Sequence, residues 1–188
     1  MKRGYTLVEI MLSAALFSLL LVVLSGSFVT IRKVSLARTR RLESRLPLLQ
    51  ANEKLSTDLA ASGADGVVVA PDLISICAKN GVTAEGKVDW SAGLTVWFWN
   101  ASGQALQVYR LSMDEARTAG FKGDGVEPLC PKEADLRAYL AGAAPGVVYP
   151  LQDFHLLLTP EGQVEWTAQA RDSGGNPFLL SRTVGFRL

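Results

Sequence analysis

The hydrophobic residues at the start of the chain form one long run. From Ile10 to Ile31, about 22 consecutive positions carry no charged side chain. This length is close to the roughly 20 residues with which one helix crosses the hydrocarbon core of a bilayer. Small and hydroxyl-bearing residues, which favour close helix packing in lipid, interrupt the run at Ser13, Ser18, Ser25, Gly26, Ser27 and Thr30. The pattern predicts a membrane-spanning helix.

Apolar residues then recur at helical spacing as far as residue 61. The stripe begins with Leu42, Leu46 and Leu49 and continues with Leu48, Leu55 and Leu59; its phase shifts near residues 43–47, and charged residues occupy the other face. We therefore predict one helix from Thr6 to Ala61, with a kink near residues 43–47 caused by Pro47. A helix of about 56 residues would span roughly 80 Å. Because one small domain cannot cover that length, its first half needs partners in a membrane or a fibre.

Beyond residue 64 the spacing of apolar residues favours strands. The predicted strands are Gly66–Ala70, Leu73–Ala78, Leu94–Asn100, Leu106–Ser112, Val147–Tyr149, Phe154–Thr159, Val164–Arg171 and Phe178–Leu188. Tight turns at 101–104 and 160–163 favour an antiparallel sheet. Residues 132–140 indicate a short helix. The predicted fold class is α+β, with a long amino-terminal helix packed on an antiparallel sheet.

Charge is unevenly distributed, although the formal net charge is only +1. Residues 32–45 hold six basic residues and one acid, whereas residues 46–188 hold 11 basic and 16 acidic residues. The second part is therefore not an obvious nucleic-acid binder. Counted alone, the basic residues that follow the apolar run would place the later part of the chain in the cytoplasm.

A specific motif precedes the apolar run. Lys2-Arg3-Gly4 is followed by Tyr5-Thr6-Leu7-Val8-Glu9. This stretch resembles the class III signal of type IV prepilins and of the pseudopilins of type II secretion, with Tyr5 where Phe is usual. The resemblance implies that a prepilin peptidase cleaves after Gly4 and methylates the new amino group of Tyr5. It also implies export, and we follow it over the charge rule.

Two other interpretations of the amino terminus stay open. In the first, the run is an ordinary secretory signal peptide that is cleaved at Ser25-Gly26-Ser27. In the second, it is a membrane anchor that is not cleaved. Glu9 argues against the signal peptide, because the apolar part of such a peptide gains nothing from an acid. An acid at the edge of a membrane helix is costly unless it is paired, and it usually marks a functional position.

The family resemblance also suggests a role for Glu9 and for the whole chain. After cleavage Glu9 lies about one helical turn from the amino group of Tyr5, so the two charges could pair within or between subunits during assembly. Residues 46–59 resemble the corresponding stretch of J-class minor pseudopilins and PilW-type minor pilins. Together these features imply a minor structural subunit that primes or caps a filament serving secretion, adhesion, motility or DNA uptake.

The implied organisation has four parts and several partners. Residues 1–4 are a leader, 5–31 the transmembrane half of the helix, 32–62 its amphipathic periplasmic half and 63–188 the globular sheet domain. The implied partners are other minor subunits, the major pilin, the prepilin peptidase and the bacterial inner membrane. The alternative is a membrane-anchored periplasmic enzyme or binding protein.

Cys77 and Cys130 are the only cysteines, and they stand about 53 positions apart. In an exported domain we expect them to form a disulfide, although two buried free thiols are the alternative. A bridge over that distance would add about 3–4 kcal/mol of stability.

No catalytic, metal or cofactor site is expected. Ser173 lies in a protease-like Asp-Ser-Gly-Gly stretch, but the only histidine, His155, has no histidine motif around it, so a hairpin loop is favoured. The acids Asp124, Glu127, Glu133 and Asp135 match no calcium-loop spacing. In Trp97-Phe98-Trp99 the side chains alternate, so both tryptophans are expected on one face, packed against the long helix or against another subunit.

Overall fold

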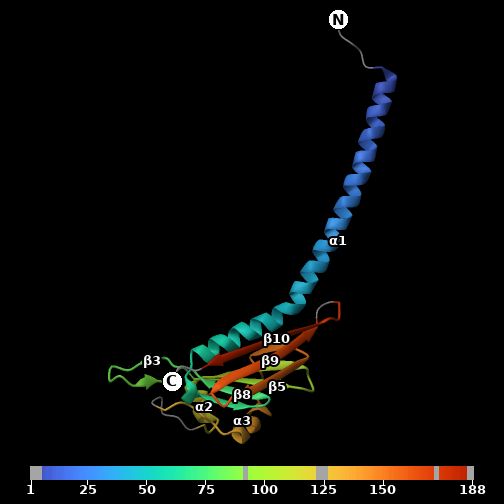
Figure 1. The fold of residues 1–188 in the computed structure, drawn as a ribbon. Coiled ribbons are helices and arrows are strands. Elements are labelled where there is room, and N and C mark those ends of the chain that lie inside the picture. The colour runs from blue at the N-terminus through green and yellow to red at the C-terminus, as the bar shows by residue number, and fades with distance from the viewer. Residues whose placement is uncertain (1–5, 91–92, 122–126, 172–173, 186–188) are drawn as a thin grey trace. The chain divides into compact units, whose positions relative to one another are not determined.

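The computed structural model describes residues 6–90, 93–121, 127–171 and 174–185. The chain forms two compact units, Met1–Leu42 and Glu43–Leu188. Helix α1 (Leu7–Ala60) begins in the first unit and ends in the second, where antiparallel strands follow it (Figure 1). The α+β class predicted from the sequence is therefore confirmed, and the architecture is consistent with the pilin fold.

The remaining elements agree closely with the predicted ones. They are η1 (Ala64–Gly66), β1 (Val67–Ala70), β2 (Leu73–Cys77), β3 (Gly81–Val82), β4 (Val88–Asp89), β5 (Leu94–Asn100), β6 (Ala105–Leu111), α2 (Met113–Thr118), α3 (Glu133–Leu140), β7 (Val147–Pro150), β8 (Asp153–Leu158), β9 (Gln163–Arg171) and β10 (Pro177–Gly185). The sequence prediction missed α2 and the short β3–β4 pair.

The strands that the structure describes form three antiparallel sheets in the second unit. The largest has the order β1-β2-β5-β6-β7, the second has the order β10-β9-β8, and β3 pairs with β4. In the first sheet Ile74 of β2 lies opposite Trp97 of β5, which lies opposite Val108 of β6. Sequential hairpins produce this order, and Gln104 turns the β5–β6 hairpin with a φ of 46°. The predicted hairpin at 101–104 is therefore confirmed.

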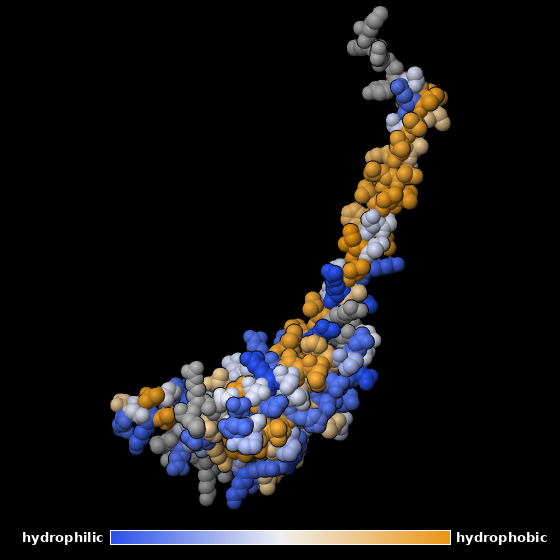
Figure 2. Space-filling view, viewed as in Figure 1, coloured by the Kyte–Doolittle hydropathy of each residue, from blue (hydrophilic) through white to orange (hydrophobic). Residues whose placement is uncertain are grey.

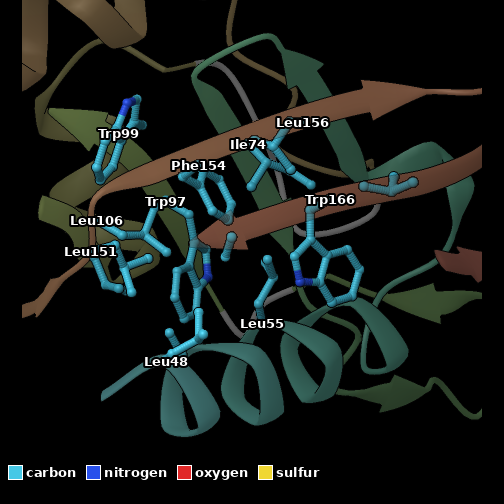
Figure 3. Packing of buried hydrophobic residues seen from close by; sticks show 14 of the residues in the cluster. Leu48, Leu55, Ile74, Trp97, Trp99, Leu106, Leu151, Phe154, Leu156 and Trp166 are labelled. Atoms are coloured by element: carbon cyan, nitrogen blue, oxygen red, sulfur yellow. The ribbon is translucent and has the colours of Figure 1, made fainter. Parts of the chain in front are cut away.

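The part of α1 that belongs to the second unit packs on the sheets through one narrow face. Leu48, Ala51, Leu55 and Leu59 are almost fully buried, and they contact a cluster that includes Trp97 and Trp166 (Figure 3). Their spacing of three and four residues keeps all four within about 80° of one another around the helix. This apolar face holds the helix on the sheets, because its burial removes several large side chains from water.

The predicted leucine stripe is wrong in part. Leu42, Leu46 and Leu49 are 66%, 49% and 44% exposed. At about 100° per residue they lie on a separate stripe, roughly 140° around the helix from the buried one. A sheet can cover only one of these stripes. Helix α1 continues through Pro47, and the kink expected there stays a prediction.

The five-stranded sheet is covered on both faces. On the face away from α1, a second core joins Leu73, Val96 and Leu111 of the sheet to Ala116 of α2 and Leu136 of α3. All five residues of β2 are consequently buried. Strand β5 shows the predicted alternation, with Trp97 and Trp99 in the core on the α1 side and Phe98 on the opposite side. The prediction that both tryptophans lie on one face of the strand is confirmed, and that face is the one toward α1.

Helix α2 begins where the sequence prediction continued a strand to Ser112. The Ser112 hydroxyl accepts a hydrogen bond from the Glu115 amide at 3.3 Å, and Glu115 Oε2 accepts one from the Ser112 amide at 2.8 Å. This reciprocal arrangement is a capping box, which ends the preceding strand and starts a helix. The Ser-x-x-Glu spacing was the signal that would have predicted α2.

Candidate functional site: the amino-terminal helix

The processing residues Gly4 and Tyr5 lie outside the described residues. Thr6 is the first described residue, and it caps the start of α1. Glu9 Oε2 accepts hydrogen bonds from the Thr6 amide at 2.8 Å and from the Thr6 hydroxyl at 3.1 Å. The Glu9 amide in turn approaches Thr6 Oγ1 at 3.4 Å. The two residues thus form a capping box that satisfies amide groups at the helix start.

This geometry gives Glu9 a local structural role that the sequence prediction missed. The Thr-x-x-Glu spacing, residues 6–9, was the available signal. Both side chains are exposed, so the Glu9 carboxylate is held in a defined position while it stays accessible to another charge. Loss of a capping residue typically costs about 0.5–2 kcal/mol of helix stability. Any assembly role of Glu9 must therefore be separated experimentally from its role in the cap.

The apolar run that follows Glu9 is exposed along the first unit. Of the described residues, one helix, α1, is long and apolar enough to cross a membrane, with a mean hydropathy of 2.6 in its most apolar window. None of that window is buried. Figure 2 shows the hydrophobic residues that cover this part of the helix. Exposed apolar surface of this extent requires lipid or other helices around it.

The hydroxyl groups within the run are satisfied by the helix itself. Five side chains donate to the backbone carbonyl four residues earlier, at 2.7–3.0 Å; they are Ser13, Ser18, Ser25, Ser27 and Thr30. In lipid, where no water can replace them, such internal hydrogen bonds remove the cost of the polar groups. The polar residues of the run therefore do not oppose insertion into a membrane.

Cys77 and Cys130 come close in the structure but remain unbonded thiols. The buried Cys77 Sγ accepts a hydrogen bond from the Leu129 amide at 3.4 Å, so it lies against the residue that precedes Cys130. Cys130 Sγ, which is exposed, donates to the Asp65 carbonyl at 2.9 Å. The expected disulfide stays a prediction, and the fold brings its two residues into the same neighbourhood.

The structure describes only some of the residues that were weighed for catalysis and metal binding. The exposed His155 Nε2 lies 3.0 Å from Asp153 Oδ2 on strand β8, while Ser173 lies outside the described residues. Glu133 pairs with Arg137 at 2.8 Å, and Asp124 lies outside the described residues. In the part of the chain that the structure describes, no group of three potential metal-binding side chains occurs.

Comparison with known families identifies the same region. A family model described as the prokaryotic N-terminal methylation motif matches residues 1–25. Comparison with curated proteins and with solved structures found no match. The motif and the exposed apolar helix together support a type IV pilin-like class III signal, and with it a pilin-like structural subunit that is anchored in a membrane and processed by a prepilin peptidase.

Proposed function

We propose that this chain is a minor subunit of a type IV pilus or a type II secretion pseudopilus that primes or caps the filament. Prepilin peptidase cleaves after Gly4 and methylates Tyr5. The processed subunit stays in the inner membrane, with its sheet domain in the periplasm, until it assembles with other minor subunits and the major pilin. The observation that carries this proposal is the methylation motif at residues 1–25 on a helix whose apolar surface is exposed.

The exposed stripe of α1 supports assembly through the helix. Leu46 and Leu49 belong to the second compact unit, yet both remain largely exposed while neighbouring Leu48 is fully buried. A helix that presents one apolar stripe to its own sheets and another to the outside can pack against a second helix. The outward stripe is therefore suited to a neighbouring subunit.

The charge of the helix supports a low copy number. Arg32, Lys33, Arg38 and Arg40 are exposed, and the first acid after them is Glu43. A filament in which identical helices run side by side would bring these cations together and would lose stability by like-charge repulsion. A chain present once or a few times at the filament end avoids this cost.

Processing is tested by sequencing the mature amino terminus. Tyr5 as the first residue supports the proposal, whereas Phe28 indicates a cleaved signal peptide and Met1 an uncleaved anchor. Gly4→Val is expected to leave the full-length precursor in the membrane, because the peptidase accommodates a residue without a side chain before the cleaved bond. Normal maturation of that variant would contradict the class III signal.

The assembly role of Glu9 is tested with two matched variants. Glu9→Gln removes the charge but keeps an acceptor oxygen for the Thr6 cap, because Gln serves in capping boxes as Glu does. Thr6→Val removes the capping hydroxyl and keeps the charge. We expect both variants to be processed and inserted, and only Glu9→Gln to lose co-purification with the other subunits.

The opposite pattern would show that the helix cap, and not the charge of Glu9, is needed for co-purification with the other subunits. If Thr6→Val lost its partners while Glu9→Gln kept them, the charge of Glu9 would have no part in assembly. Retention of partners by both variants would remove Glu9 from the assembly mechanism altogether.

A further inference from the structure

Four basic side chains surround α1 directly after its apolar run. Arg32, Lys33, Arg38 and Arg40, here called the basic collar, are all exposed, and no acid lies between them. Among the described ion pairs, none involves a collar residue. The collar has a net charge of +4 over about 12 Å of helix, at 1.5 Å rise per residue.

The arrangement of the collar around the helix indicates what kind of partner it binds. At about 100° per residue, with Arg32 at 0°, the other three side chains project near 100°, 240° and 80°. The widest gap between neighbouring cations is about 140°, so the positive charge extends around the whole helix. A partner helix contacts one face and would select cations on that face alone, whereas a headgroup layer surrounds a membrane helix on every side.

The position of the collar along the helix places it at such a layer. Arg32 immediately follows Ile31, the last residue of the apolar run, and the run is about as long as the hydrocarbon core is thick. Side chains on a helix lean toward its amino terminus, so Arg38 and Arg40 extend back toward the bilayer. The surface potential of an anionic membrane reaches about 8–10 Å into solution at moderate salt.

We propose that the basic collar binds the phosphate groups of anionic phospholipids at the membrane surface where the apolar run ends. Each cation near an anionic surface is attracted to it, and the four act on the same rigid helix. The collar then holds the subunit at a fixed depth in an anionic bilayer. This inference rests on the membrane-anchored part of the proposed function and not on filament assembly.

The test measures which lipids surround the full chain in reconstituted bilayers. Spin-labelled phosphatidylglycerol and spin-labelled phosphatidylcholine are compared for their relative association with the protein. We expect phosphatidylglycerol to be favoured at least about threefold at low salt, with the preference falling as added NaCl shortens the screening length. Protease protection of the helix confirms that each sample is inserted.

Two variants with the same change in charge locate the effect. The collar variant replaces Arg32, Lys33, Arg38 and Arg40 with Gln. The control variant replaces four exposed cations of the second unit with Gln; they are Lys87, Arg110, Lys132 and Arg182. We expect the collar variant to associate equally with both lipids and the control variant to keep the preference of the unmodified chain.

Several outcomes would overturn the proposal. The first is equal association of both lipids with the unmodified chain. The second is a preference for phosphatidylglycerol that survives in the collar variant. The third is a control variant that loses this preference as much as the collar variant does. If the collar variant kept its lipid preference but lost co-purification with other subunits, the collar would bind an acidic protein instead. If the collar variant did not insert, the salt titration of the unmodified chain would test the proposal instead, and a lipid preference that did not change with added NaCl would contradict it. A chain that did not insert at all would contradict the anchor and not only the collar.

Discussion

The indole N–H of Trp97 donates a hydrogen bond to Asp58 Oδ2 at 3.2 Å, which joins the central sheet to helix α1. Trp97 is fully buried, and its ring stacks on Tyr149 with 5.9 Å between centroids. The second oxygen of Asp58 binds Lys54 Nζ at 2.5 Å. A carboxylate that is 11% exposed therefore has a partner for each oxygen, as a largely buried charge requires.

We predict that Asp58→Ala lowers the free energy of unfolding by about 1–3 kcal/mol, because it leaves the buried Trp97 N–H without an acceptor. Lys54→Met removes only the more exposed partner and should cost less than about 1 kcal/mol. Denaturant unfolding of the full chain in detergent, followed by tryptophan fluorescence, measures both changes. Equal losses for the two variants would show that the ion pair, rather than the indole hydrogen bond, stabilises this contact.

Two adjacent leucines test which stripe of α1 belongs to the core. Leu48 is fully buried against the sheets, whereas Leu49 is 44% exposed. Leu48→Ala should destabilise the second unit by about 2–5 kcal/mol, because it leaves a cavity. Leu49→Ala should cost well under 1 kcal/mol in the same unfolding experiment. Similar losses for both variants would contradict the described orientation of the helix.

The packing of α3 on the sheet predicts a dependence on pH. Arg137 of α3 binds the Asp72 carboxylate with two nitrogens, at 2.5 and 3.0 Å. The hydrogen bond from Arg137 lowers the pKa of Asp72 below its ordinary value of 3.8. A carboxyl group whose pKa is lower in the folded state stabilises the fold at pH above its unfolded pKa. That stabilisation is lost as the pH falls through the folded pKa.

We therefore expect Asp72→Asn to lower stability by about 0.5–1 kcal/mol near neutral pH, since the pair is partly exposed to solvent. In strongly acid solution the variant and the unmodified chain should be equally stable. Thermal unfolding of the two proteins between pH 2 and pH 7 measures this convergence, with the substitution Asp114→Asn at an exposed side chain of α2 as a control. A constant difference across that range would show that Asp72 acts through its shape rather than its charge.

How well the sequence predicted each feature depended on how local the physical signal was. The limits of α1 and of eight strands follow from the spacing of apolar residues within short windows, and the structure confirms them closely. Which leucines of the helix are buried, such as Leu48, and which are exposed, such as Leu49, depends on the face that meets the sheets. The spacing of apolar residues alone did not predict that face. The hydrogen bond between Asp58 and Trp97 joins residues 39 positions apart, and no local pattern predicts it.

The candidate site shows the same limit. The motif around Gly4 and Glu9 was recognisable as a sequence, and the family comparison at residues 1–25 agrees with it. The cap formed by Thr6 and Glu9 was also encoded locally, because the Thr-x-x-Glu spacing is that of a capping box, and the same residues belong to the processing motif. The proximity of Cys77 and Cys130 required the tertiary fold, because Cys77 ends strand β2 whereas Cys130 lies in the loop before α3.

The two thiols lie where a bridge would tie the loop before α3 to the end of β2. Burial raises the pKa of the Cys77 thiol, and the hydrogen bond from the Leu129 amide opposes that rise only in part. Although Cys130 is exposed as a residue, neighbouring atoms keep part of the solvent from its sulfur, and this desolvation raises the pKa of its thiol, helped by Cys77 and Asp65. Because the thiolate is the reactive form, both cysteines should exchange slowly at neutral pH and faster as the pH rises.

We predict that the exported protein carries the Cys77–Cys130 disulfide and that Cys130→Ser lowers its stability by about 3–4 kcal/mol under oxidising conditions. The same substitution should cost little in a reductant, because Cys130 is exposed and its thiol makes only one hydrogen bond. Thiol labelling after denaturation without reductant counts the free cysteine thiols directly. Two labelled cysteines in protein from the periplasm, together with an effect of Cys130→Ser that is the same with and without reductant, would exclude the bridge. The stability difference would then belong to the packing of the loop against Asp65.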